Sequence, residues 1–348
     1  MNYYIFGGTG FIGTHLAKLI KSRDNSAKVY NLDVVNPENI RQALDNKVAS
    51  WATVKDYKTA LVEGEKHQAT WVECDVRKPI ELPANIQPTS EDIIFNFAAI
   101  HRTPGHPDYD YFETNVRGAE NVCAFAEKHG IKKIVFTSSI APYGAAESEK
   151  FETTLPTPNT AYGISKLVAE KVHMIWQAKG EGRQLTIVRP GVVFGRGENG
   201  NFTRLYWGIR GGKFAYPGRK DTIKACIYVK ELVRFMLYRL ENHANGVELY
   251  NCCYEPAYTI EHIVEAMKKV TGMKKSIPMI PNWIIMPAAA VIGALGAPMG
   301  ICPARVKKLQ ISTNICGRKL AESGYTFKWT FEEALADWFE DNSRNGLK

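Results

Sequence analysis

The sequence lacks the features that mark secreted, disulfide-bonded or nucleic-acid-binding proteins. Its seven cysteines are an odd number, none stands in a C-x-x-C pair, and the neighbours Cys252 and Cys253 cannot easily bridge each other. We therefore expect reduced thiols and a cytoplasmic protein, since no signal-peptide pattern precedes the first strand-like run. Basic residues interleaved with aromatics are also missing. The net charge of +8 thus argues for a polyphosphate ligand rather than for nucleic acid.

Charge is missing altogether between Ser276 and Ala304, a stretch that includes "WIIMPAAAVIGALG". Its length reaches the range of about 20 residues that can span a membrane. Prolines at positions 281, 287, 298 and 303 interrupt any single helix and argue against a span. We expect a buried or lid helix here, and peripheral membrane contact through residues 283–302 is the alternative.

Glycine is concentrated near the start of the chain, in "MNYYIFGGTGFIGTHLAKLI". Gly7, Gly10 and Gly13 give the spacing G-x-x-G-x-x-G between a strand-like run and a helical apolar stripe that begins with Phe11 and Ile12. Glycine allows a backbone to approach a ligand closely, and the free N–H groups at a helix start favour a pyrophosphate. The pattern predicts a dinucleotide-binding loop.

An acidic residue at the end of the second strand is the other part of this fingerprint, because it binds the adenosine ribose hydroxyls. "KVYNLD" supplies it as Asp33, and no arginine follows within the next few residues to accept a 2′-phosphate. The sequence therefore predicts NAD rather than NADP as the cofactor. The alternative is that Asp33 only caps a turn.

Strand-like and helix-like segments alternate through the first half of the chain. The strand-like runs are "NYYIF", "KVYNLD", "TWVEC", "DIIFNFAA", "KKIVFTSS" and "LTIVRP". Helical apolar spacing covers about Asp110 to His129 and "AYGISKLVAEKVHMIWQAK", and we expect a helical, polar insert from Pro37 to about His67. This order predicts an α/β fold of the Rossmann type, a doubly wound parallel sheet followed by a smaller C-terminal α/β part.

We expect two domains. Residues 1–190 would form the NAD-binding domain, and residues 225–254, with a helix near Lys230–Leu240 and the strand "GVELYN", would return to it. Residues 191–224 and 255–348 would form the substrate domain, with helices at Ile260–Val270 and Phe331–Asn342.

Ligands of such sheets bind at the carboxyl ends of the strands, where chemically useful residues occur in this chain. Ser139 follows the fifth strand, while Tyr162 and Lys166 lie four residues apart in "AYGISK", on one face of a helix. A phenol has an unperturbed pKa of about 10, so a neighbouring ammonium group is needed to favour its ionised form. The set would move a proton beside a hydride acceptor. The Y-x-x-x-K spacing alone would indicate only two residues on the surface of an amphipathic helix, but the glycine loop upstream favours a catalytic role.

Several motifs together resemble those of the extended short-chain dehydrogenase/reductases, particularly the nucleotide-sugar epimerases and dehydratases of the UDP-glucose 4-epimerase type. They are "GGTGFIG", "CDVRKP", "NFAAIH", "ETNVRGAENV", "FTSSIAPYG", "AYGISKLVAEK" and "VRPGVVFGRG". The resemblance implies that Ser139, Tyr162 and Lys166 are catalytic and that Lys166 also binds the nicotinamide ribose. It further implies cofactor contacts by Asp75, Val76, Ala98, Ala99, Asn115, Ser138 and Pro190.

The second half of the chain resembles the nucleotide-sugar part of this family. "ENGNFTRL" implies diphosphate contacts by Asn201 and Arg204, and "KFAYPGRKDTIK" implies a base-binding strand with Tyr216. Lys224 stands where many relatives have a phosphate-binding arginine, which keeps the charge but loses the bidentate geometry. For Arg204 and Lys224 the alternative is a solvated surface charge.

The residues after the fifth strand narrow the reaction. Sugar 4,6-dehydratases of this family have Thr-Asp-Glu there, whereas this chain has "SSIAPYG". The resemblance therefore favours an NAD-dependent epimerase that acts on a nucleotide-diphosphate sugar through a transient 4-keto intermediate. It also implies a homodimer formed through the helices of Asn115 and Tyr162, and it implies no metal. The alternatives are a 4-keto-sugar reductase, a hydroxysteroid-type dehydrogenase and a dinucleotide-sensing scaffold without catalysis.

Overall fold

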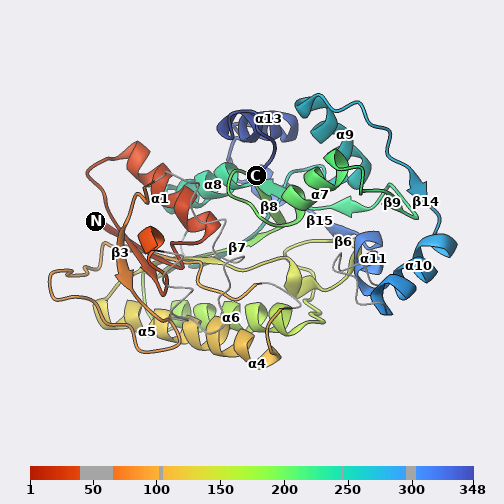
Figure 1. Ribbon diagram of the computed structural model, residues 1–348. Helices are drawn as coiled ribbons and strands as arrows, with labels where there is room; N and C mark the ends of the chain where they lie inside the picture. The colour runs from red at the N-terminus through yellow and green to blue at the C-terminus, as the bar shows by residue number, and fades with distance from the viewer. Residues whose placement is uncertain (40–65, 102–104, 245, 295–302) are drawn as a thin grey trace.

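The computed structural model describes residues 1–39, 66–101, 105–244, 246–294 and 303–348. The strands of its main sheet are β1 (Asn2–Phe6), β2 (Lys28–Asp33), β3 (Thr70–Glu73), β4 (Ile93–Asn96), β5 (Lys133–Thr137), β7 (Gln184–Pro190) and β12 (Gly246–Cys252). These seven strands pair in the order β12-β7-β5-β4-β1-β2-β3 (Figure 1). Every pair is parallel.

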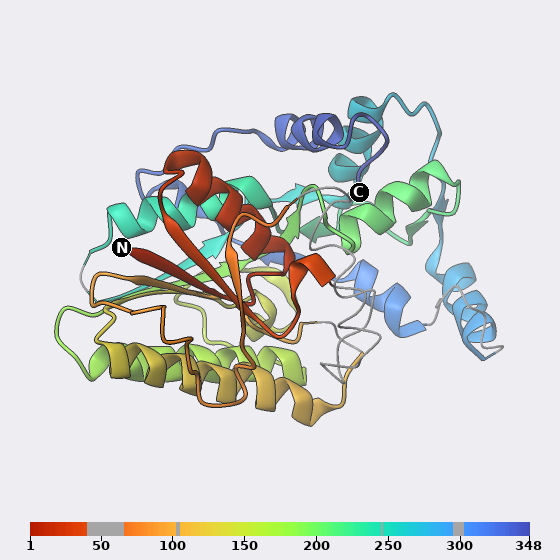
Figure 2. The same cartoon turned by 60° about the vertical axis from the view of Figure 1, so that its left-hand side comes forward.

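Helices cover both faces of this sheet. The helices α1 (Phe11–Arg23) and α8 (Val229–Glu241) lie on one face, and α5 (Arg117–His129) and α6 (Ala161–Ala178) lie on the other (Figures 1 and 2). Alternate residues of β1 point to opposite faces, so Tyr4 and Phe6 pack with residues of α5 and α6, while Ile5 packs with residues of α1 and α8. The predicted Rossmann-type fold is confirmed.

The strand order reverses between β1 and β4. The chain runs outward from β1 through β2 to β3, then returns to β4 and continues through β5 and β7 to β12. Ligands of doubly wound sheets bind at such a reversal, beyond the carboxyl ends of the strands. The insert between β2 and β3 begins with a short 3₁₀ turn, η1 (Pro37–Asn39). The helical insert predicted from Pro37 to His67 otherwise lies largely outside the described residues.

The second half of the chain adds smaller sheets and a separate core. The strands β8 (Val192–Phe194) and β11 (Cys226–Tyr228) pair in parallel, and a four-stranded sheet has the order β13 (Tyr258–Thr259), β10 (Ile223–Lys224), β15 (Thr313–Ile315) and β6 (Ala146–Lys150). The core there includes residues of α7 (Asn201–Arg210), α9 (Ile260–Thr271) and α13 (Phe331–Asp341). Strand β12 and helix α8 return to the main sheet, while β6 extends outward to β15. The division into cofactor and substrate domains stays a prediction.

The helix predicted over about Asp110 to His129 is interrupted. It begins as α4 (Asp108–Tyr111), widens into a π turn, η2 (Phe112–Val116), and continues as α5. Within this turn the Asn115 side chain forms two hydrogen bonds with the backbone of Ile100. Its amide oxygen accepts one of 2.8 Å from the Ile100 N–H, and its amide nitrogen donates one of 3.0 Å to the Ile100 carbonyl oxygen. Because π turns aim side chains that a regular helix would place elsewhere, this one directs Asn115 at the segment after β4.

Of the expected buried or lid helix in the charge-free segment, burial is wrong for the described side chains of residues 282–291 other than Ala289, and the lid stays a prediction. Strand β14 (Met279–Ile280) pairs with β9 (Tyr216–Pro217) and leads into α10 (Asn282–Ala294), followed by α11 (Pro303–Gln310). Trp283 is 77% exposed and Val291 is 60% exposed. Both views place α10 at the edge of the molecule, where α11 lies beside it (Figures 1 and 2), so the main sheet does not cover its apolar residues. None of the described helices is long and apolar enough to cross a membrane.

Candidate active site

The glycine loop connects β1 to α1 at the reversal of strand order. Gly7 has a φ of +75°, and a Cβ atom there would lie 2.8 Å from the Cα of Ala98, which follows β4. A Cβ on Gly13 would lie 2.6 Å from the Cα of Gly8, so this glycine permits close packing of α1 against the loop. Helix α1 begins at Phe11, and its N-cap residue Gly10 makes no side-chain cap.

This geometry fits a bound dinucleotide. The first N–H groups of α1, in the segment that includes Phe11, Ile12 and Gly13, have no acceptor within the helix and carry the positive end of its dipole. A pyrophosphate is the ligand that such a helix start accommodates best. Sequence analysis missed His67, whose Nε2 lies 2.9 Å from the carbonyl oxygen of Gly8. No spacing rule links these two residues, because the intervening insert separates them by 59 positions.

Asp33 lies at the end of β2 with its carboxylate already oriented. One oxygen accepts a hydrogen bond of 3.1 Å from the Thr9 N–H, and the other accepts one of 3.1 Å from the Val35 N–H. Burial raises the pKa of Asp33 to about 6, although these hydrogen bonds lower it in part. An oriented carboxylate beside the glycine loop suits the two hydroxyls of a ribose.

The other predicted cofactor contacts lie at the ends of neighbouring strands. Asp75 follows β3 and forms an ion pair of 2.7 Å with Arg77. Burial opposes ionisation there, but the hydrogen bonds from Arg77 lower the pKa of Asp75. Val76 is buried, whereas Ala98 and Ala99, which follow β4, are partly exposed. Position alone supports their predicted roles, and these roles stay predictions.

The predicted catalytic residues meet where β5 ends and α6 begins. Thr160 caps α6 by accepting a hydrogen bond of 3.1 Å from the Gly163 N–H, which places Tyr162 in the first turn. Ser139 follows β5 and lies near enough to the Tyr162 phenol to lower its pKa. The Ser139 Oγ accepts a hydrogen bond of 3.1 Å from the Ala141 N–H. The backbone after β5 therefore fixes the position of the serine side chain.

Lys166 lies one helical turn after Tyr162 and is 2% exposed. Its ammonium group donates a hydrogen bond of 2.5 Å to the Thr137 carbonyl oxygen and lies 4.4 Å from the centre of the Phe136 ring. Burial lowers the pKa of Lys166 to about 7, although the Glu170 carboxylate raises it in part. The lysine is therefore a buried group that can lose its charge near neutral pH.

The sequence-based expectation that the Lys166 ammonium group favours the ionised phenol stays a prediction. Burial raises the pKa of Tyr162 above its ordinary value of 10.0, and the nearby Tyr111 adds to this rise. The nearby Ser139 side chain lowers the pKa only in part. An additional positive charge is needed to ionise the phenol, and the oxidised nicotinamide ring of the cofactor carries one.

A buried ionic network that sequence analysis missed lies directly behind these residues. Glu170, on α6, accepts a hydrogen bond of 2.5 Å from the Ser138 hydroxyl. The Arg189 guanidinium, from β7, donates to both Glu170 oxygens, over 2.8 and 2.6 Å. Ser138, predicted as a cofactor contact, thus uses its hydroxyl within the protein. Pro190, the other cofactor candidate at the end of β7, accepts a backbone hydrogen bond of 3.3 Å from Ile140.

Asn115 connects two segments that border the site. Besides its bonds to Ile100, its amide donates a hydrogen bond of 2.9 Å to the Ser165 hydroxyl on α6. The residue is 3% exposed. It therefore connects α6 to the segment after β4, while its predicted cofactor contact stays a prediction.

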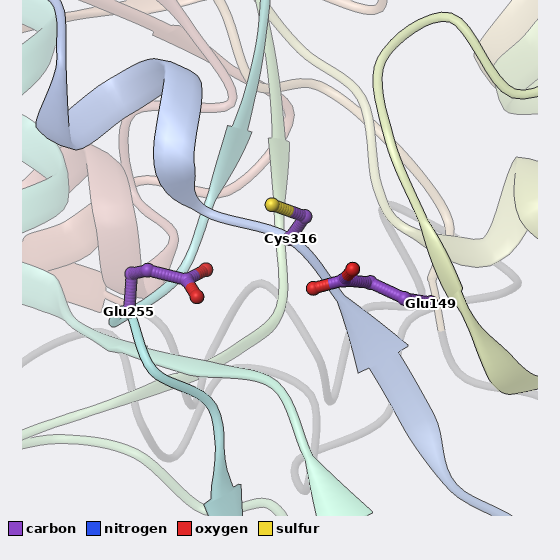
Figure 3. Close-up of side chains that lie close together, drawn as sticks. All are labelled: Glu149, Glu255 and Cys316. Carbon is purple, nitrogen blue, oxygen red and sulfur yellow. The ribbon is translucent and has the colours of Figure 1, made fainter.

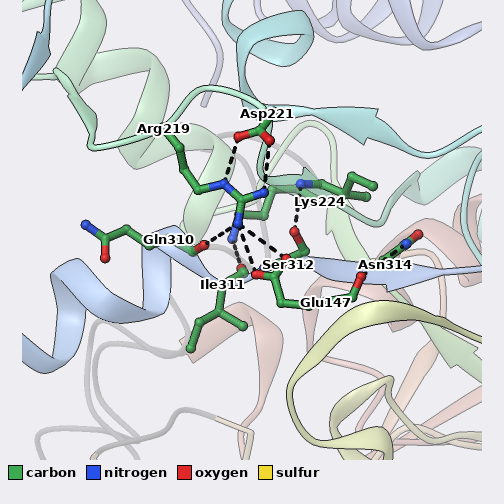
Figure 4. Close-up of polar contacts among 9 residues, drawn as sticks. Glu147, Arg219, Asp221, Lys224, Gln310, Ile311, Ser312 and Asn314 are labelled. Carbon is green, nitrogen blue, oxygen red and sulfur yellow. Dashed lines mark hydrogen bonds and ion pairs between the residues drawn. The ribbon is translucent and has the colours of Figure 1, made fainter. Parts of the chain in front are cut away.

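The predicted substrate contacts lie in the second half of the chain. Asn201 and Arg204 are exposed on the first turn of α7, where Arg204 donates a hydrogen bond of 3.1 Å to the Asn201 side chain. Tyr216, on β9, is 1% exposed and the Lys220 ammonium lies 5.1 Å from its ring centre. Lys224, on β10, donates a hydrogen bond of 2.6 Å to the Ile311 carbonyl oxygen (Figure 4). Their roles toward a substrate stay predictions.

A group of potential metal ligands occurs at a different place, formed by Glu149, Glu255 and Cys316, whose ligand atoms lie within 4.8 Å of one another (Figure 3). Both glutamates are exposed. One Glu255 oxygen already accepts a hydrogen bond of 2.8 Å from the Gly317 N–H. Exposed carboxylates of this kind are common without a metal, and we assign no metal site here. The six cysteines in the described part of the chain are free thiols.

A glycine loop, an oriented Asp33 and a Ser-Tyr-Lys set at the carboxyl edge of one parallel sheet define a dinucleotide-dependent enzyme of the Rossmann class. The chain belongs to the NAD dependent epimerase/dehydratase family, whose model matches residues 3–253. NAD, the cofactor predicted from the sequence, is the cofactor of this family.

Known proteins resemble the chain over almost its whole length. It is 29% identical over 349 residues to N-acetyl-alpha-D-glucosaminyl-diphospho-ditrans,octacis-undecaprenol 4-epimerase of Escherichia coli O157:H7, with 96% of this chain and 93% of the relative covered. UDP-glucose 4-epimerase of Bacillus subtilis is 24% identical over 302 residues, which cover 80% of this chain and 84% of the relative. The structure of UDP-glucuronic acid 4-epimerase from Bacillus cereus in complex with NAD shares the fold. Its TM-score is 0.70, with 17% identity, 98% of this chain and 99% of that chain covered.

Proposed function

We propose that the protein is a 4-epimerase that acts on a sugar linked through a diphosphate, with a nucleotide as the first candidate for the group beyond the diphosphate. The observation that carries this proposal is the meeting of Ser139, Tyr162 and Lys166 beside the glycine loop, in a member of the epimerase/dehydratase family. The relatives that are named as 4-epimerases support it.

In this proposal the chain's own residues move one proton in each direction. Bound NAD supplies the hydride acceptor. Tyr162, as phenolate, takes the proton of the sugar C4 hydroxyl while the Ser139 hydroxyl holds that oxygen, and C4 becomes a ketone. The 4-keto sugar turns over, Tyr162 returns the proton to the ketone oxygen, and the hydride returns to the opposite face. No net oxidation or reduction of the sugar occurs.

Three other reactions are weaker candidates. A dehydratase needs an acid and a base to eliminate water, but the residues after β5 are Ser138, Ser139 and Ile140, whereas sugar 4,6-dehydratases of the family that the chain resembles have Thr-Asp-Glu there. A 4-keto-sugar reductase or a hydroxysteroid-type dehydrogenase would use the same Ser-Tyr-Lys set. Unlike an epimerase, either would consume or produce reduced cofactor in proportion to its substrate.

A second candidate for the group beyond the diphosphate is a polyprenyl chain. The relative with 29% identity is named for a sugar joined by a diphosphate to undecaprenol, and the match covers nearly all of both chains. Such a substrate keeps the diphosphate and the sugar of a nucleotide sugar but replaces the nucleoside with a lipid.

The experiment is to incubate the purified protein, without added cofactor, with UDP-glucose, UDP-N-acetylglucosamine and N-acetylglucosaminyl-diphospho-polyprenol, each deuterated at C4. We expect a C4-inverted product that retains the deuterium, because the hydride leaves and returns to the same carbon. Loss of the label to solvent would contradict an epimerase. So would stoichiometric consumption of NADH in a parallel incubation to which NADH is added. Which of the three substrates reacts identifies the group beyond the diphosphate.

The predicted homodimer is part of the proposal. Exposed apolar side chains gather on the helices of the predicted interface, namely Tyr109, Phe112, Ile164, Val168 and Ile175. Helices α4 and α5 lie against α6, so these side chains belong to one layer of the molecule (Figure 1). Burial of this face against a second copy would remove apolar surface from water. Light scattering of the purified protein tests it, and a monomer at micromolar concentration would count against it.

A further inference from the structure

We infer that α10 and the cationic residues around it form a docking surface for an anionic lipid bilayer, on which the protein lies without crossing it. We define the docking surface as β14, α10 and α11. This inference goes beyond the proposed reaction and holds for either carrier of the sugar.

The first observation is the exposure of large apolar side chains in this part of the molecule. Trp283 is 77% exposed, Val291 60% and Ile284 43% on α10, while Met279 on β14 and Leu309 on α11 are each 50% exposed. Among the α10 side chains that the structure describes, only that of Ala289 is buried. Exposed large apolar side chains that gather in one part of a protein indicate an interaction surface.

The second observation is the charge of the surrounding sequence. From Ala266 to Ala321 the chain has nine lysines and arginines and no aspartate or glutamate. They are Lys268, Lys269, Lys274, Lys275, Arg305, Lys307, Lys308, Arg318 and Lys319. Since the whole chain has a net charge of +8, this stretch accounts for all of its positive excess. Lys268 forms an ion pair with Glu265, and Lys319 bonds to the backbone of β12, so the charges that complement an anionic surface are those next to the apolar helix.

The cations flank the apolar helix rather than interrupt it. Lys274 and Lys275 are exposed just before β14, and Lys307 is exposed on α11. No charged residue lies between Lys275 and Arg305. Tryptophan side chains favour the boundary between a membrane and water, and lysine heads favour anionic headgroups, so exposed Trp283 with lysines before and after the helix suits a position in the headgroup region.

Length separates docking from spanning. The described part of α10, Asn282–Ala294, has 13 residues and is about 20 Å long, whereas the hydrocarbon core of a bilayer is about 30 Å thick. Pro287 lies inside the helix, and an interfacial helix tolerates its missing hydrogen bond because water and headgroups reach the backbone.

A second copy of the chain is a less suitable occupant for this surface. Two copies related by a two-fold axis would bring the same cations together, which is unfavourable unless anions intervene. The exposed apolar residues of α4 to α6 already offer a separate face for a dimer. The lipid surface is therefore the partner that fits both the apolar residues and the charge.

The docking surface adjoins the predicted substrate region. Strand β14 pairs with β9, which contains Tyr216, and α11 also lies close to β9. The side chain of Asn282, at the start of α10, accepts a hydrogen bond of 2.6 Å from Gln310 on α11. A docked α10 would thus hold the second half of the protein next to the lipid headgroups.

The test is sedimentation of the purified full-length protein with two kinds of vesicle. One consists of phosphatidylcholine alone, and the other is a mixture of three parts phosphatidylcholine to one part phosphatidylglycerol, a ratio chosen for the assay. We expect binding to the mixed vesicles at low salt, weaker binding at higher salt, and little binding to phosphatidylcholine alone. The double variant Trp283→Glu/Val291→Glu should bind at least about tenfold more weakly, because it places carboxylates in the interface. Lys274→Glu/Lys307→Glu should weaken binding to the mixed vesicles by about tenfold or more.

The matched control is Leu155→Glu, because Leu155 is 79% exposed but lies before α6, outside the docking surface. It should sediment with vesicles as the unmodified protein does. All variants change exposed residues, and unchanged melting temperatures would show that they fold. Failure of the unmodified protein to bind the mixed vesicles, or equal binding by Trp283→Glu/Val291→Glu, would overturn the inference. So would a dimer that this variant converts to monomers. No sugar is present in the assay, so its result is independent of the proposed reaction.

Discussion

The ammonium group of Lys166 donates a hydrogen bond of 2.5 Å to the carbonyl oxygen of Thr137, the last residue of β5. Ser138 and Ser139 follow Thr137 directly, so this bond fixes the first turns of α6 against the strand that delivers the serine. The lysine thus has a structural contact as well as its predicted chemical role. Substitutions at the site can separate the two.

Replacement of Tyr162 by phenylalanine should remove catalysis and keep the fold. The ring can still pack beside Tyr111, from which its centre lies 6.3 Å away, and only the hydroxyl is lost. A positioned acid or base contributes a factor of about 10² to 10⁴ to the rate. We expect turnover of a diphosphate-linked sugar to fall by at least about a hundredfold, with NAD binding and melting temperature unchanged. A variant that retains more activity than this would show that another group carries the proton.

The pKa of Tyr162 should fall when NAD binds. In the protein alone burial raises this pKa, and the oxidised nicotinamide ring would bring a positive charge to the site. The pKa can be followed by phenolate absorbance, as the difference between the protein and Tyr162→Phe, with and without NAD. We expect the pH profile of turnover to rise through the lower of the two values. Lys166→Met should weaken NAD binding and turnover together, and an unchanged phenol pKa on NAD binding would contradict this mechanism.

Local patterns were sufficient to predict the main sheet, while the roles of the candidate site residues stay predictions. Strands such as β1 and β5 are short apolar runs bounded by polar residues, and the spacing of Tyr162 and Lys166 follows from the period of a helix. The structure adds contacts between distant segments. Glu170 and Arg189 lie 19 positions apart on different elements, and no motif announces their pairing. The sequence-based expectation for α10 was a buried or lid helix, but its large apolar side chains are exposed. Hydropathy reports a preference for apolar surroundings and does not say whether protein or lipid provides them.

Replacement of Asp33 by alanine should weaken NAD binding by about 1 to 3 kcal/mol, the range for hydrogen bonds to a charged acceptor. The pKa of Asp33 is about 6 in the protein alone, so its carboxylate is charged above this pH and neutral below it. NAD affinity should therefore be constant above about pH 6 and decrease below it, whereas Asp33→Asn should remove this pH dependence. Calorimetric titration with NAD and NADP measures both effects, and tighter binding of NADP by the unmodified protein would refute the assignment.

Replacement of Lys224 or Asn201 by alanine should raise the KM for the sugar substrate more than it lowers kcat. Both residues would bind a part of the substrate that does not react, so their contribution is the same in the ground state and the transition state. Lys224 also bonds to the Ile311 backbone, and melting temperatures must show that the small sheet remains intact. Lys213→Ala is the control, because Lys213 is an exposed lysine whereas Lys224 is half-buried. An unchanged KM in both variants would remove these residues from the substrate site.

Removal of one partner of the Glu170–Arg189 pair should lower the free energy of unfolding strongly. Removal of both partners together should lower it less than the two single changes added. Their side chains are 0% and 4% exposed, and the Ser138 hydroxyl donates to the same carboxylate. Removing one partner of a buried pair leaves an uncompensated charge, which costs about 3 to 5 kcal/mol of the free energy of unfolding. Glu170→Met and Arg189→Met should each show a loss of this size. The double variant should lose less than the sum of the two, since neither charge then remains buried.

Urea denaturation of the four proteins in this cycle measures the coupling between Glu170 and Arg189. The surface pair of Arg23 and Glu241 is the matched control, because its side chains are 41% and 63% exposed at a similar distance of 3.0 Å. Its coupling should not exceed about 1 kcal/mol. The Ser138 hydroxyl donates to Glu170, and Ser138 directly precedes Ser139, so Glu170 helps to fix the position of Ser139. Glu170→Gln should therefore lower kcat even where the protein remains folded. Equal coupling in the buried and the exposed pair would mean that solvent screens both, and that the network behind Ser139 does not hold the site in place.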